Sequence, residues 1–151
     1  MEINRANLDW YVIGRRPKDA SVRTFLLTRI RDAGRLPDEL SPPIPFDPQA
    51  ELADAWGIIG GARRVEVVLR FDSSVRAWVM ERRWPGMTDR TLDALGRPVL
   101  SFNAPLHKDG VPVELYAWIR GWGPNVEVLE PSALRVQWLA DARCLLERYA
   151  K

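Results

Sequence analysis

Two short segments near the start of the chain constrain the fold most, because their side-chain pattern fits strands rather than a helix. Residues 10–13 are aromatic or β-branched, which favours a strand. Residues 22–30 then alternate with a period of two, and one face carries Arg23, Phe25, Leu27 and Arg29. The polar link between the segments contains glycine, proline and aspartate, so we predict a hairpin with a basic tip.

The second predicted strand combines basic and aromatic side chains on one face. A guanidinium group binds phosphate through two parallel hydrogen bonds, and an aromatic ring stacks on a nucleic-acid base. Alternation places Trp10 and Tyr11 on opposite faces of the first strand. A tryptophan at a strand centre usually belongs to a core, so we expect Trp10 to be structural and Tyr11 to join the ligand surface. The alternative is a solvated face in which Phe25 packs inward and the arginines pair with carboxylates.

These two segments resemble the signature of the WYL domain. Trp10-Tyr11-Val12 matches its Trp-Tyr-Leu, whereas Arg23-Thr24-Phe25 and Arg29-Ile30 match an Arg-x-Phe element followed by Asp-Arg-Ile. This chain departs at Leu26, where the family usually has arginine, and at Thr28, which replaces the aspartate.

The resemblance implies that residues 1–32 are the C-terminal part of a WYL domain, an Sm-like β-barrel of bacterial transcriptional regulators. It also implies an effector site for nucleic acid or another negatively charged ligand. The residues that we assign to this site are Tyr11, Arg23, Phe25 and Arg29.

A proline-rich stretch separates this hairpin from the rest of the chain. Residues 33–46 contain four prolines, which exclude a helix interior and predict an extended linker. Asp47-Pro48 then has the pattern of a helix start, with Leu52, Trp56 and Ile59 on one face. We therefore predict that a linking helix and a second domain occupy residues 47–151.

The second domain alternates between strand and helix patterns. Strands are predicted over residues 64–71, 87–94, 97–104 and around 126–128. Three helices are expected between and after them, with these apolar stripes: Val75, Trp78 and Val79; Leu115, Trp118, Ile119 and Trp122; and Leu134, Trp138, Ala142, Leu145 and Tyr149. The order β-α-β-β-α-β followed by a helix predicts a ferredoxin-like plan with an additional C-terminal helix.

Phrases along this second domain are similar to those of WCX domains, the C-terminal extensions of WYL regulators. They are VEVVLRFDSS, LYAWIRGWGPNVEVLEPSALR and LLERY. The predicted fold is therefore α+β: a partial Sm-like β-barrel (WYL) hairpin joined to a ferredoxin-like βαββαβ WCX domain. Such regulators carry an N-terminal winged helix-turn-helix, and no helix pair of that kind is expected here. Contact with duplex DNA would then depend on a segment absent from this chain.

A second basic pair lies on the first strand of the WCX domain. Arg64 and Arg70 share the face that points away from the apolar stripe. They could complete a groove for a phosphate backbone if this sheet packs against the hairpin. The alternative is an ordinary solvated sheet face.

Other residue types argue against several functional classes. Cys144 is the only cysteine and His107 the only histidine, so we expect no disulfide, metal site or cofactor. The sequence lacks nucleophile-elbow and phosphate-loop motifs, so we expect no enzyme. No apolar stretch reaches the roughly 20 residues of a membrane span, so we expect a cytoplasmic protein with no membrane partner.

Together these observations predict the effector-sensing and dimerisation portion of a bacterial transcriptional regulator. Its effector would be a short single-stranded nucleic acid or a related phosphate ligand, held by the hairpin arginines together with Arg64 and Arg70. A homodimer is expected, because an open hairpin edge favours strand pairing between two chains. The alternative is a protein-interaction or dimerisation module that has no nucleic-acid ligand.

Overall fold

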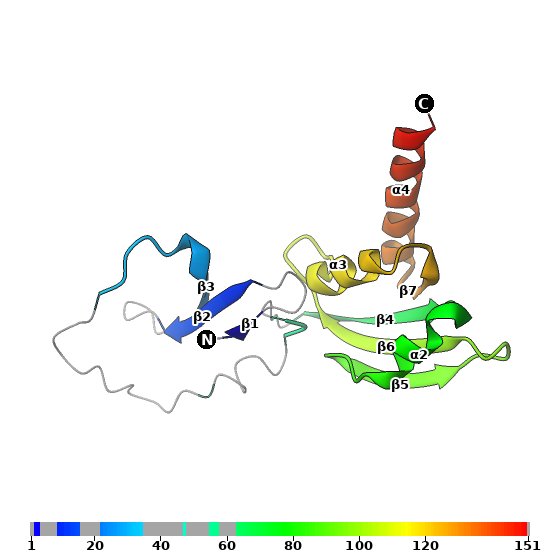
Figure 1. Ribbon diagram of the computed structural model, residues 1–151, viewed down its shortest axis with the longest axis horizontal. Coiled ribbons are helices and arrows are strands. Elements are labelled where there is room, and N and C mark those ends of the chain that lie inside the picture. Colours follow the sequence, from blue (N-terminus) through cyan, green and yellow to red (C-terminus); the bar gives the residue numbers. More distant parts are fainter. Residues whose placement is uncertain are drawn as a thin grey trace.

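The computed structural model describes residues 2–3, 9–15, 22–34, 47, 55–57 and 63–150. The described chain contains two antiparallel sheets, one of three strands and one of four (Figure 1). Its helices of more than one turn all lie in the C-terminal part, with the four-stranded sheet. The predicted α+β class is therefore confirmed.

The three-stranded sheet contains the predicted hairpin. It is formed by β1 (Glu2–Ile3), β2 (Trp10–Arg15) and β3 (Val22–Leu26), in that order. The short β1 is not among the strands predicted from the sequence. It pairs with Trp10 and Tyr11 and so covers the start of the edge of β2 that β3 does not occupy.

The second hairpin strand is shorter than its sequence pattern predicts. The expected strand over residues 22–30 ends at Leu26, and Leu27–Arg29 form a 3-10 turn, η1. Tyr11 pairs with Leu26, and β2 begins at Trp10. A longer β3 would therefore run past the end of its partner strand, and a turn satisfies its backbone groups instead.

The four-stranded sheet has the ferredoxin-like arrangement. Its strands are β4 (Arg64–Phe71), β5 (Met87–Leu92), β6 (Pro98–Pro105) and β7 (Val126–Glu130). Their order in the sheet is β5-β6-β4-β7, and all neighbours are antiparallel. Each strand lies where the sequence predicts one, within about two residues.

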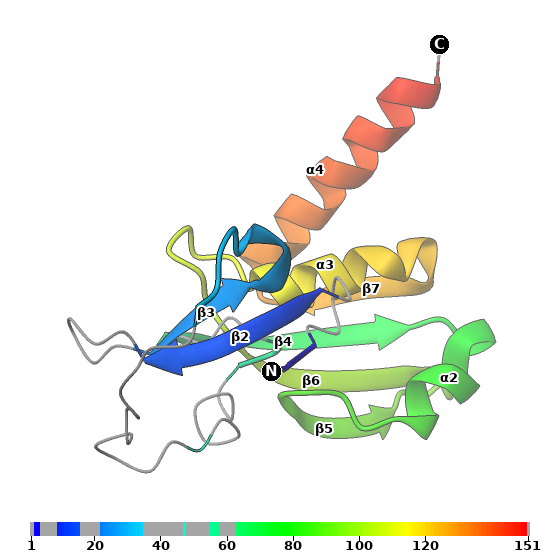
Figure 2. The ribbon, with the colours of Figure 1, turned by 60° about the vertical axis from the view of Figure 1, so that its left-hand side comes forward.

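Helices complete the predicted β-α-β-β-α-β order and extend it. They are α2 (Arg76–Glu81), α3 (Val113–Gly121) and α4 (Ser132–Tyr149). A 3-10 turn, η2 (Ser73–Val75), leads into α2, and Asp72 caps it by accepting a hydrogen bond from the Ser74 amide at 2.9 Å. Helix α3 lies along the sheet, whereas α4 starts beside β7 and projects away from it (Figures 1 and 2).

The core lies between the sheet and helices α2 and α3. It is formed by alternate residues of the two central strands, Val67, Leu69, Phe71, Leu100, Phe102 and Ala104, all fully buried. Val79 of α2 and Leu115 and Ile119 of α3 close it from the helical side.

The predicted place of Trp78 in this core is wrong, because its side chain is 69% exposed. Helix α2 has fewer than two turns, and its single buried row is taken by Val75 and Val79.

Most of the predicted linker and linking helix lies outside the described residues. That holds for residues 35–46 and for Leu52 and Ile59 of the expected helical face. Trp56 is described and is buried as predicted, but it lies in a bend rather than a helix. Its ring packs edge-on against Phe102, with the centroids 5.2 Å apart.

Candidate functional site

The strand register decides which hairpin side chains share a face. Val12 is paired with Phe25, and Gly14 with Arg23. Directly opposed residues of an antiparallel pair project to the same side, so these four lie on one face. Phe25 is 43% exposed, and Arg23 is exposed beside a glycine with no side chain. The structure therefore brings Arg23 and Phe25 together on an accessible surface.

The aromatic residue that joins this face is Trp10 rather than Tyr11. Tyr11 is paired with Leu26, so it lies on the opposite side from Phe25 and is half-buried there. Trp10 shares the face of Val12 and is 47% exposed, contrary to its expected structural role. The sequence alternation separates Trp10 from Tyr11, but only the register shows which of them lies with Phe25.

Arg29 lies beyond the strand that was expected to carry it. It is the last residue of η1, and its side chain is exposed. The turn is closed by a hydrogen bond of 3.1 Å from the Ile30 amide to the Leu27 carbonyl. Arg29 therefore belongs to the turn that follows the face of Arg23 and Phe25, not to the face itself.

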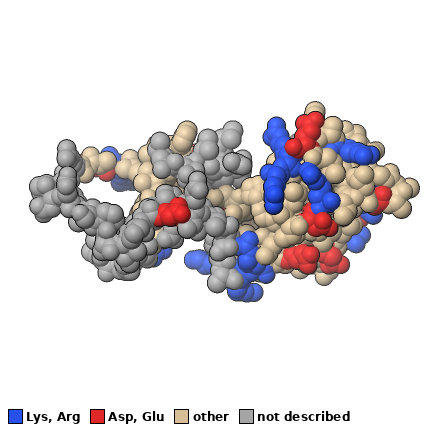
Figure 3. Space-filling model, turned by 90° about the horizontal axis from the view of Figure 1, so that it is seen from below, with Lys and Arg blue, Asp and Glu red and all other residues tan. Residues whose placement is uncertain are grey.

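Arg64 and Arg70 lie at opposite ends of β4, and the structure does not bring them together. Arg70 is six positions after Arg64 along the strand, a distance of about 20 Å. Arg64 donates through Nη2 to the Asn103 carbonyl at 2.7 Å. Arg70 donates through Nε to Glu127 Oε2 at 3.1 Å, and Arg135 Nη2 is 3.8 Å from the other oxygen of Glu127. Arg70 thus belongs to a mixed-charge group, and basic and acidic side chains are also mixed on the surface in Figure 3.

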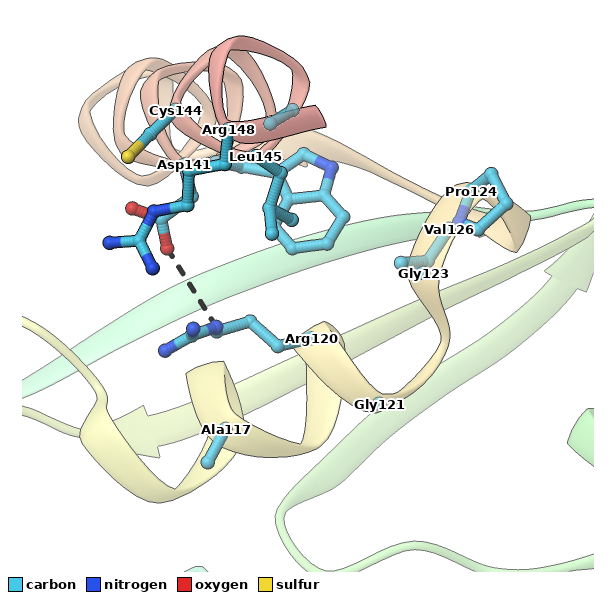
Figure 4. A pocket seen from close by; sticks show the side chains of 12 residues that line it. Ala117, Arg120, Gly121, Gly123, Pro124, Val126, Asp141, Cys144, Leu145 and Arg148 are labelled. Carbon is cyan, nitrogen blue, oxygen red and sulfur yellow. Dashed lines mark ion pairs between the residues drawn. The ribbon is translucent and has the colours of Figure 1, made fainter. Parts of the chain in front are cut away.

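A groove between α3 and α4 was not expected from the sequence. It has a volume of about 990 Å³, and residues from α3, from the turn after it and from α4 line it (Figure 4). The Tyr116 hydroxyl donates to Asp141 Oδ2 at 2.8 Å, and Arg120 Nε is 3.7 Å from the same oxygen. Burial raises the pKa of Tyr116 because it disfavours the phenolate, and Asp141 raises it further. These two contacts join the middle of α4 to α3.

The described residues contain no group of three or more side chains suited to a metal ion. His107 lies in the turn after β6, where its Nδ1 is 3.0 Å from Asp109 Oδ2. Among the described helices, none has the length and apolarity needed to cross a membrane.

Comparison with known proteins assigns the larger part of the chain to one domain family. The family model of the WCX domain matches residues 63–146, which is more than half of the sequence. The chain therefore belongs to the WCX domain family, as the sequence predicted. Within the matched region lie the four-stranded sheet, α2, α3 and most of α4.

One solved structure similar to this chain is the proteasome accessory factor B/C (PafBC) of Arthrobacter aurescens. The two share 21% sequence identity with a TM-score of 0.36. The match covers 85% of this chain but only 18% of the PafBC chain. No curated protein matches this sequence.

Proposed function

We propose that this chain is the effector-sensing and dimerisation portion of a bacterial transcriptional regulator. The proposed effector is a short single-stranded nucleic acid or a related phosphate compound. One observation supports the ligand class most strongly: Arg23, Phe25 and Trp10 share a single accessible face of the hairpin. Membership of the WCX family supports the regulatory setting.

The chemistry of this face suits a single strand better than a duplex. Exposed rings can stack on bases only when the bases are not already stacked and paired. Arg23, and Arg29 from the adjoining turn, would hold the phosphates that alternate with those bases. Phe25 and Trp10 would supply the stacking surfaces, and their contacts would tolerate many sequences.

A fluorescence-polarisation titration tests this proposal. The full chain is titrated with a labelled single-stranded oligonucleotide at two salt concentrations, and with a duplex of the same sequence. We expect saturable binding of the single strand that weakens as salt rises, and weaker binding of the duplex. The proposed ligand class is rejected if the single strand does not bind at the lower salt concentration.

A second candidate function is supported by α4. Its exposed apolar side chains include Val136, Leu139 and Leu146, which the helical spacing places on one row away from the sheet. Contiguous exposed apolar surface favours contact with another protein chain. The alternative is therefore a dimerisation or protein-interaction module with no nucleic-acid ligand. Analytical ultracentrifugation separates the two, because this alternative predicts a stable dimer that binds no oligonucleotide.

A further inference from the structure

A second pocket lies where the WCX domain meets Trp56 and Gly57 of the preceding segment, and no described hairpin residue lines it. Its volume is about 300 Å³, at the lower end of the range typical of small-molecule sites. Three tryptophans and two arginines supply most of its lining: Trp56, Trp84, Trp118, Arg82 and Arg83. The ring centroids of Trp84 and Trp56 lie 4.8 and 5.6 Å from that of Trp118, so the three indoles form one aromatic group.

The loop after α2 holds one side of this pocket in place. Helix α2 ends at Glu81, and Trp84 is fixed by a 3.2 Å hydrogen bond from its indole Nε1 to the Val79 carbonyl. The loop then turns at Gly86, whose φ of +63° suits glycine. A side chain there would begin 3.0 Å from the Asn103 carbonyl oxygen. The loop therefore approaches β6 closely and has a defined shape.

The buried carboxylate of Glu114 fixes the side of the pocket that Trp56 and Gly57 form. Glu114 of α3 is only 7% exposed, and its Oε2 accepts a hydrogen bond of 3.1 Å from the Gly57 amide. This contact fixes the Trp56-Gly57 segment against α3, although 57 residues separate its two partners in the sequence. Both sides of the pocket are thus positioned by specific hydrogen bonds.

The arginines distinguish this pocket from a simple gap in the core. The guanidinium carbon of Arg82 lies 5.9 Å from the Trp84 ring centroid, and both Arg82 and Arg83 are exposed. Within the part of the chain that the structure describes, neither forms an ion pair with a carboxylate, unlike Arg70 and Arg97. The pocket thus combines an aromatic lining with two positive charges.

We propose that this pocket binds a small planar aromatic anion, meaning a flat ring that carries a phosphate or carboxylate group. The indoles would contact the ring, and the two guanidinium groups would hold the anionic group. A nucleoside monophosphate and an aromatic carboxylic acid share this chemistry. The site is separate from the hairpin face, so either proposal can fail without affecting the other.

Isothermal titration calorimetry on the full chain tests the ligand chemistry. The probes are adenosine 5′-monophosphate and indole-3-carboxylate, together with ribose 5-phosphate and adenosine as compounds that lack the ring or the charge. We expect saturable binding of at least one of the two aromatic anions. Each incomplete compound should bind at least about tenfold more weakly, because one charge-assisted contact is worth about that factor. Absence of binding by both aromatic anions would overturn the proposal.

Variants locate the binding. Arg82→Gln combined with Arg83→Gln should weaken it at least about tenfold, whereas Arg143→Gln on α4 should not change it. All three arginines are exposed, so these variants should fold, and thermal melts check this. Trp84→Leu should also weaken binding, with the exposed Trp78→Leu as its control. Binding that survives the arginine pair but is lost in Phe25→Ala would place the ligand on the hairpin and overturn the proposal.

Discussion

Asp93 organises the tight turn between β5 and β6. Its Oδ1 accepts hydrogen bonds from the amides of Leu95 and Arg97, both at 2.9 Å, and its Oδ2 accepts one from Arg97 Nε at 2.8 Å. Gly96 completes the turn with a φ of +73°, a conformation that suits glycine. Hydrogen bonds from Arg97 hold the pKa of Asp93 below its ordinary value of 3.8, and the bond from the Arg97 backbone amide has the largest effect.

Asp93→Asn should therefore lower the thermal midpoint at neutral pH. A lowered pKa means that this carboxylate stabilises the fold above pH 3.8, and that the stabilisation is lost as the pH falls below that value. The difference between parent and variant should shrink as a series of melts is carried into acid. Melting curves that differ equally at pH 7 and pH 3 would contradict the assigned role of the charge.

Trp118 connects the core to the aromatic group beside it. Its ring centroid lies within 6 Å of those of Trp56, Phe71, Trp84, Phe102 and Trp122. Trp118→Ala should lower the free energy of unfolding by about 3 kcal/mol, because the truncation leaves a cavity among these rings. Urea unfolding measures this directly, with the exposed Trp78→Ala as the matched control. If both variants lost an equally small amount of unfolding free energy, Trp118 would not be essential to the packing of these rings.

Helix α4 is an element whose two halves have different surroundings. Leu134 is buried and Trp138 is half-buried, but Leu145 and Tyr149 of the same predicted stripe are 58% and 83% exposed. A helix of 18 residues is about 27 Å long, whereas β7 has five residues and α3 nine. The second half of α4 therefore extends beyond the elements that cover its first half.

The exposed row of α4 should take part in self-association. Leu139→Glu combined with Leu146→Glu should shift the chain toward monomer in sedimentation, since two charges would be buried in any helix-to-helix contact. Ala133→Glu with Cys144→Glu adds the same charges on another side of α4 and should leave association unchanged. A dimer that persists in the leucine variant but is lost in Val22→Pro would instead assign the contact to the edge of β3 that faces away from β2.

Periodicity was sufficient to predict the elements of the WCX domain. In residues 64–71 every second side chain is apolar, and β4 has those bounds with Val67, Leu69 and Phe71 buried. It was less informative for short or isolated elements. The exposure of Trp78 and of Leu145 depends on how far the neighbouring elements extend. A local sequence pattern contains no information on that extent.

At the scale of the whole molecule, the candidate site depends on pairings between strands. Arg23 and Phe25 could be predicted as neighbours on one face because they lie on the same strand. Trp10 joins them only through the register of β2 with β3. Arg70 could not be assigned from the sequence, because its partner Glu127 lies 57 residues away on β7.

The central claim is that the hairpin contacts the phosphates of a single strand, and salt dependence tests it most directly. The affinity of a labelled oligonucleotide is measured over a series of salt concentrations for the parent and for Arg29→Ala, with Arg143→Ala as the control. Loss of one phosphate contact should weaken binding and reduce the slope of log affinity against log salt by about 0.7. The Arg143 variant should retain the parent slope. An Arg29 variant with unchanged affinity and slope would contradict the account.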